Sequence, residues 1–203
     1  MLAAKRTAPS DGLAAALLDA QRRGEISEGE MLATVTLLYC LGHMDAGYIV
    51  AAGLNLLAEL PDVYDEFRNN PSARDAIINE IIRYDPAELS VYRTNTEDLV
   101  IGSVNIPAGS SIRYLIGAAN RDPDVYNSPQ MFDHHRPAEQ SRNMSFGLGV
   151  HGCIGQAFSR AQARTIFEVV AERFSKIALV EPVVMANNDF SRHFKKLSLR
   201  LTR

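Results

Sequence analysis

The chain contains 203 residues, of which 46% are hydrophobic, and carries a formal net charge of −3. These values indicate a soluble globular protein of one domain, or at most two. Lysines and arginines are scattered among carboxylates without a basic run, which excludes nucleic acid as an expected partner. The first residues lack the apolar core of a signal peptide. Cys40 and Cys153 lie in different surroundings, so we expect no disulfide and a reducing, cytoplasmic compartment.

Two helices are predicted in the first part of the chain. Apolar residues at helical spacing predict a short amphipathic helix over residues 12–24. Ser27 and Glu30 then have the spacing of a capping box, which predicts the start of a long helix. This helix is expected to end before Pro61, because proline cannot continue it.

The long helix has no polar face, and between residues 31 and 58 Asp45 is its only charged residue. Such a helix is buried either in protein or in a bilayer. Its length is sufficient to span a membrane, but Gly42, His43 and Asp45 would then lie among lipid, where ionisable groups are costly. We therefore expect no membrane insertion. The rest of the chain is too short to cover the helix, which predicts self-association or a complementing chain.

The middle and end of the chain alternate between helices and short strands. Residues 61–70 predict a short helix, and Ser72 is expected to cap another that contains Glu80 and Arg83. Taken alone, this pair would be a surface ion pair worth less than about 1 kcal/mol. Strands are expected around residues 91–94, 99–101, 111–115, 176–184 and 196–202.

A glycine-rich segment from Ser145 to Arg160 is the most distinctive stretch of the sequence. Its glycines permit backbone angles that other residues avoid, so the chain can approach a flat ligand closely. Cys153 follows them, just before a helical pattern that begins at Gly155. A helix N-terminus favours thiolate over thiol, which suits a nucleophile or a soft metal ligand.

Three roles fit a thiolate at the position of Cys153. A nucleophilic phosphatase loop needs an arginine six residues later, where Ser159 stands instead. A buried, inert cysteine would leave the preceding glycines unexplained. The third role is axial ligation of haem iron by the thiolate.

The spacing of five residues carries a resemblance to a known family. Phe146, Gly149, His151, Cys153 and Gly155 match every fixed position of the haem-binding signature of the cytochrome P450 superfamily, bacterial soluble type. The resemblance runs from about residue 10 to the end and covers the C-terminal half of the family only. It implies a mainly α fold with small β-sheets, incomplete without the N-terminal half.

The resemblance also implies a cofactor site. Cys153 would be the metal ligand of haem b (iron protoporphyrin IX), and Arg93 and His151 would meet its propionates. The cofactor-binding residues as a whole would be Arg93, Phe146, Gly147, Gly149, His151 and Gly155. Glu80, Arg83 and Arg136 would form a structural clamp rather than a catalytic group.

The oxygen-activation motif of the family is only partly present. Gly42 is retained, whereas Met44 replaces the usual acid and Asp45 the usual threonine. Asp45 would either relay protons itself, since burial raises a carboxyl pKa toward values suited to acid catalysis, or only cap a break in the helix near Gly42.

The expected organisation is a single partial domain, residues 1–203. Its segments are a short and a long helix (10–60), helices with the Glu-x-x-Arg pair (61–90), a β-rich segment (91–145), the cysteine loop with its helix (146–174) and terminal strands (175–203). The resemblance implies a haem-thiolate monooxygenase in truncated or split form, acting on an apolar small molecule with a ferredoxin or flavodoxin-type electron donor. The alternative is a haem-binding or haem-free remnant that acts as an oligomerisation module without oxygen chemistry.

Overall fold

A computed structural model of the chain describes residues 11–203. Most of the N-terminal segment in which no signal peptide is expected lies outside this range. Over these residues the structure is mainly helical with four small two-stranded sheets, which confirms the predicted fold class. The chain divides into two compact units between Met44 and Asp45, and its predicted organisation as one partial domain stays a prediction.

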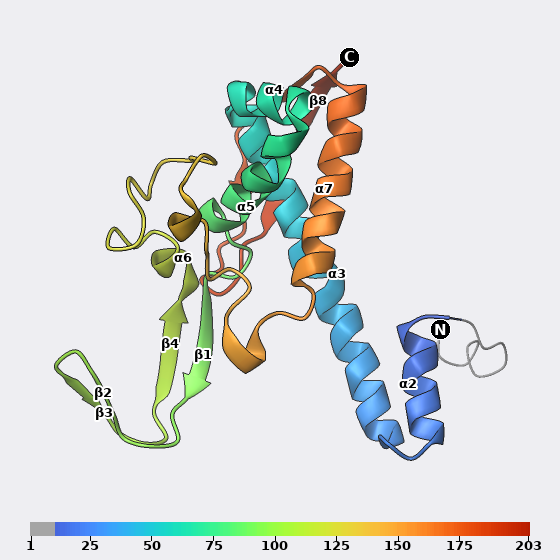
Figure 1. Cartoon of the computed structure of the whole chain (residues 1–203), viewed down its shortest axis with the longest axis vertical. Coiled ribbons are helices and arrows are strands. Elements are labelled where there is room, and N and C mark those ends of the chain that lie inside the picture. The colour runs from blue at the N-terminus through green and yellow to red at the C-terminus, as the bar shows by residue number, and fades with distance from the viewer. Residues whose placement is uncertain (1–10) are drawn as a thin grey trace. The chain divides into compact units, whose positions relative to one another are not determined.

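The first unit contains α2 (Leu13–Arg22) and the N-terminal part of α3 (Glu28–Glu59), which continues into the second unit (Figure 1). The predicted capping box is present. The Ser27 amide donates to Glu30 Oε2 at 2.8 Å, and the Glu30 amide donates to Ser27 Oγ at 3.2 Å. These reciprocal bonds satisfy two amides at the start of α3.

The core of the second unit is helical. It is built by the C-terminal part of α3 and by α4 (Pro61–Asn69), α5 (Arg74–Tyr84) and α7 (Gln156–Arg173). One strand, β5 (Lys176–Leu179), adds the buried side chain of Ile177. Phe67 and Phe167 lie edge to face with their ring centroids 6.0 Å apart. Gly53 on α3 makes room for this pair, because a Cβ there would lie 2.2 Å from the Phe167 ring. α3 and α7 therefore approach closely at this glycine.

The prediction that Ser72 caps α5 is wrong. Residues Pro71–Ala73 form a 3₁₀ turn, and Ala73 occupies the position before α5. The Ser72 hydroxyl instead donates backward to Asn70 Oδ1 at 2.6 Å. The extra turn moves the start of α5 two residues beyond Ser72, out of reach of its side chain.

The strands form antiparallel pairs. β1 (Ser90–Thr94) pairs with β4 (Ser111–Leu115), with Ser90 opposite Leu115 and Thr94 opposite Ser111. β2 (Leu99–Ile101) pairs with β3 (Val104–Ile106), a strand that the sequence did not predict. A single turn, α6 (Ile116–Ala119), follows β4.

The two predicted C-terminal strands are each interrupted. β5 (Lys176–Leu179) pairs with β8 (Leu199–Thr202), and β6 (Val184–Met185) pairs with β7 (Phe194–Lys196). A register shift at Val184 and Met185 disturbs the second pair. The alternating pattern was therefore correct in kind but did not show where the strands break.

α3 changes in burial along its length. From Ala46 onward one side of it enters the core. Nearer its start Met31 is buried, but several other large apolar side chains are exposed. The exposed ones are Leu32, Leu37, Tyr39, Leu41 and Met44. By length and composition α3 is long and apolar enough to cross a membrane, and 22% of its most apolar window is buried within the protein.

Candidate functional site

The cysteine loop connects η3 (Gly149–His151), a short 3₁₀ turn, to α7. Gly147 and Gly149 have φ angles of 66° and 70°, a left-handed conformation that glycine adopts without strain. The Cys153 amide donates to the carbonyl of Phe146 at 2.8 Å, which closes the loop on itself. Cys153 lies three residues before Gln156, the first residue of α7, rather than on the helix.

A buried asparagine fixes the start of this loop. The Asn120 side chain is fully buried, accepts a hydrogen bond from the Met144 amide at 2.7 Å and donates to Ser145 Oγ at 2.8 Å. Ser145 Oγ in turn donates to the carbonyl of Ile82 on α5 at 2.7 Å. The loop is therefore held to α5 before the glycines begin.

The other side of the loop is held through Phe146. Its half-buried ring packs against the core, and the Arg160 guanidinium lies over it, 5.4 Å from the ring centroid. Arg160 Nη2 also donates to Asn79 Oδ1 on α5 at 2.9 Å. The ring and guanidinium together connect the loop, α5 and α7.

The outer surface of the loop is apolar. Val150 is 97% exposed and Ile154 is 91% exposed, with Leu148 and Phe158 also exposed beside them. Cys153 is exposed and is not in a disulfide. Hydrophobic side chains gathered around an exposed thiol indicate a surface that another apolar body covers.

This arrangement fits a flat apolar cofactor with a soft metal. Gly155 leaves space beside the thiol, since a Cβ there would lie 3.7 Å from Cys153 Sγ. Gly147 and Gly149 present bare backbone on the same loop. A single thiolate donor with an apolar surround is the donor set of a haem-thiolate centre. The residues of the loop therefore fit haem.

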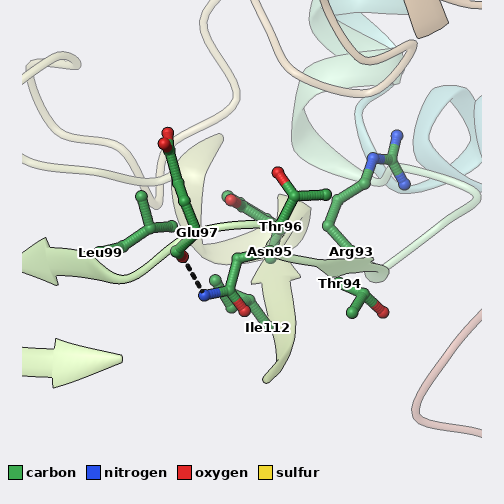
Figure 2. A pocket seen from close by; sticks show the side chains of 8 residues that line it. Arg93, Thr94, Asn95, Thr96, Glu97, Leu99 and Ile112 are labelled. Carbon is green, nitrogen blue, oxygen red and sulfur yellow. Dashed lines mark hydrogen bonds between the residues drawn. The ribbon is translucent and has the colours of Figure 1, made fainter. Parts of the chain in front are cut away.

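Arg93 and His151 are the two predicted propionate contacts. His151 is exposed on η3. Arg93 lies on β1 and lines a pocket of about 210 Å³ with Asn95, Glu97 and neighbouring residues. Figure 2 shows its guanidinium directed away from the turn in which Asn95 donates to the Glu97 carbonyl. Among the described residues it donates only to the carbonyl of Tyr92, at 2.8 Å, so donors are left for a ligand.

Glu80, Arg83 and Arg136 come together as one buried cluster. Arg83 is fully buried and donates to both carboxylate oxygens of Glu80 at 2.7 Å. Arg136 Nε donates to Glu80 Oε1 at 3.2 Å. The remaining donors of Arg83 reach the backbone carbonyls of Asn120, Pro129 and Met131. The cluster ties α5 to the segment before the cysteine loop.

The residues predicted to occupy the oxygen-activation motif lie on α3. Gly42 and Met44 are exposed, and Asp45 is half-buried. Burial raises the pKa of Asp45 above its usual range, and the charge of His193 partly offsets this. α3 is continuous from Glu28 to Glu59, so the reading in which Asp45 only caps a break in the helix near Gly42 is wrong. The proton relay stays a prediction.

Sequence reasoning missed Glu88. Its Oε2 atom is buried and has no hydrogen-bond partner within residues 11–203. Burial, together with the charge of Asp45, raises the pKa of Glu88 to about 7. The sequence around Glu88 carries no motif, and only the folded structure shows its proximity to Asp45.

Comparison with known proteins identifies the family of the chain. A profile of the family Cytochrome P450 matches residues 2–200. Cytochrome P450 107B1 of Saccharopolyspora erythraea is 35% identical over 181 residues, which are 88% of this chain and 44% of that protein. Erythromycin C-12 hydroxylase of the same organism is 30% identical over 198 residues, 97% of this chain and 49% of that protein.

Solved structures give the same result. The P450 enzyme CxnD, described as acting in C-S bond formation in chuangxinmycin biosynthesis, superposes with a TM-score of 0.89 at 32% identity, over 100% of this chain and 51% of CxnD. The tirandamycin C-bound P450 monooxygenase TamI superposes with a TM-score of 0.92 at 28% identity, over 99% of this chain and 51% of TamI. The chain spans about half the length of the curated relatives it matches. It belongs to the cytochrome P450 family.

Proposed function

We propose that this chain is the haem-binding half of a bacterial P450 monooxygenase, in which the Cys153 thiolate ligates the iron of haem b. The observation that carries the proposal is the exposed cysteine on a glycine loop, surrounded by exposed apolar side chains. When bound, the haem supplies the iron at which dioxygen is activated, so that one oxygen atom enters an apolar small molecule.

The chain's own residues would bind and orient the cofactor. Gly147 and Gly149 would let the cofactor approach their bare backbone, while Phe146 supports the loop from the core side. Arg93 has guanidinium donors left for a propionate, and the exposed His151 would contribute a second contact. Charge-assisted hydrogen bonds of this kind fix orientation as well as adding affinity.

The half-length chain needs a covering partner. Large apolar side chains stand exposed on the first part of α3 and around the cysteine loop. Burying them stabilises an assembly by roughly 25 cal/mol per Å² of apolar surface. We propose that a complementing N-terminal half, or a second copy of the chain, covers them, and that the protein acts in the cytoplasm with a ferredoxin or flavodoxin-type electron donor.

A second candidate function is a haem-carrying or haem-free remnant that acts as an interaction module. It is favoured by the replacement of the usual acid and threonine of the family motif by Met44 and Asp45. The complete cysteine loop favours the enzyme over a haem-free remnant, because a chain that binds no haem has no chemical need of that loop.

Electron-driven oxygen uptake separates the two candidates. The chain is reconstituted with haem, alone and with a P450 N-terminal half added as a separate chain, and is supplied with NADPH, a surrogate ferredoxin and its reductase. An enzyme consumes oxygen well above the level of the matched Cys153→Ala protein. A chain that retains haem but consumes oxygen no faster than that variant, in both settings, is the remnant.

A further inference from the structure

Two adjacent histidines and a glutamate meet away from the cysteine loop. Glu66 lies on α4, and His134 and His135 lie in the segment before the 3₁₀ turn at Ala138–Gln140. One metal-binding atom from each of the three lies within 4.8 Å of the others. Nε2 of His134 is 2.9 Å from Glu66 Oε2, and Nε2 of His135 is 3.6 Å from the same oxygen.

The backbone that carries these histidines is held in place. The His135 amide donates to Asp133 Oδ1 at 2.9 Å, and the Asp133 amide donates to Glu80 Oε1 at 2.9 Å. The segment is therefore connected to the buried cluster of Glu80, Arg83 and Arg136. A site carried on such a support loses less entropy when it binds a ligand than a site on a free loop.

The side chains are also oriented by packing. The His134 side chain is only 8% exposed and lies against the Phe132 ring, with centroids 6.2 Å apart. The two imidazole rings lie 4.0 Å apart and are tilted by 41°. The His135 side chain is 70% exposed, yet its Nε2 faces the carboxylate. The hydrogen bond with Glu66 explains the orientation of the His134 side chain. It does not explain why the His135 side chain also points toward this carboxylate.

The donor set and its spacing suit zinc. Neutral imidazole and carboxylate are ordinary zinc ligands, with bonds of about 2.0–2.2 Å, so ligand atoms around a tetrahedral ion lie about 3.3 Å apart. The distances of 2.9 and 3.6 Å bracket that value. Two histidines and one glutamate leave the fourth position to water.

We propose that Glu66, His134 and His135 form a zinc site that joins α4 to the segment carrying Arg136. Its residues are separate from those of the proposed haem site, and its role is to stabilise the second unit. Zinc that binds the folded chain and not the unfolded one raises stability by mass action.

Calorimetric titration of the tag-free, haem-free chain with zinc chloride tests the proposal. We expect one ion per chain and, at a zinc concentration about 100-fold above Kd, a rise of about 5–10 °C in the thermal unfolding midpoint. Glu66→Gln and His135→Ala should each weaken binding at least about tenfold. His135→Ala is the more informative variant, because its exposed side chain can be removed without disturbing folding.

Two controls separate this site from other zinc ligands. His43→Ala removes an exposed histidine on α3 and should leave binding unchanged. The double variant Cys40→Ser, Cys153→Ser removes the two exposed thiols and should also retain the site. Absence of saturable binding, binding lost with the cysteines, or equal affinity in wild type and His135→Ala would each overturn the proposal.

Discussion

Glu80→Ala tests the energetic role of the buried cluster. The substitution removes the carboxylate that accepts two hydrogen bonds from Arg83, one from Arg136 and one from the Asp133 amide. Arg83 is fully buried and the Arg136 side chain is 4% exposed. Both guanidinium charges would then remain in the interior without their counter-ion.

The expected loss of stability is large. Breaking a buried ion pair by removing one partner costs about 3–5 kcal/mol, because the other charge is left uncompensated. An exposed ion pair contributes about 0–1 kcal/mol. The loss of stability in Glu80→Gln should lie between these two values, because the amide oxygen still accepts one or two of the hydrogen bonds but the negative charge is gone.

Urea unfolding followed by circular dichroism measures the difference. Asp75→Ala is the matched control, because Asp75 lies on the same helix, is 78% exposed and forms an exposed ion pair with Arg164 at 2.8 Å. We expect Glu80→Ala to lose at least about 3 kcal/mol and Asp75→Ala to lose less than about 1 kcal/mol. Equal, small losses in both variants would refute the assignment of a structural clamp.

Three further substitutions test other parts of the account. Gly53→Ala places a Cβ 2.2 Å from the Phe167 ring and should lower the free energy of unfolding by about 1–3 kcal/mol. In the control Gly47→Ala the new Cβ has no atom within 4 Å, so this substitution should be neutral or stabilising. Similar urea midpoints for the two variants would contradict this. Because the pKa of Glu88 rises from 4.5 to about 7 on folding, its carboxyl lowers stability as pH rises through that range. The urea midpoint of Glu88→Gln should therefore fall less than that of wild type between pH 4.5 and 7, and parallel profiles would refute the burial of this carboxyl. Arg93→Ala should weaken haem affinity about 10- to 100-fold in a fluorescence-quenching titration while retaining the thiolate spectrum, because hydrogen bonds to charged groups contribute about 1.5–3 kcal/mol; unchanged affinity would remove Arg93 from the site.

The helices were predictable because their signals are local. The capping box of Ser27 and Glu30 and the prolines at positions 61 and 71 are readable within a few residues. Ser72 shows the limit of this reading. Its residue type suits a helix cap, but a 3₁₀ turn intervenes, and the sequence does not encode that choice within so short a window.

The candidate site was likewise predictable only where its signal is local. The cysteine loop was predictable because five fixed residues lie within ten positions. Contacts between distant segments were not predictable. No local sequence pattern indicates the hydrogen bond between Asn120 and the Met144 amide, or the one between Glu66 and His134. The bonds that Arg83 makes to backbone carbonyls likewise depend on how remote loops return to α5.

The central claim is that Cys153 ligates haem iron, and the spectrum of the reduced, carbon monoxide-bound protein tests it most directly. The wild-type chain, reconstituted with haem, should show the red-shifted Soret band of a thiolate-ligated haem, and Cys153→Ala should not. Cys40→Ser is the control for the other exposed thiol and should leave the band unchanged. A wild-type spectrum without that band, or the same band in Cys153→Ala, would contradict the account.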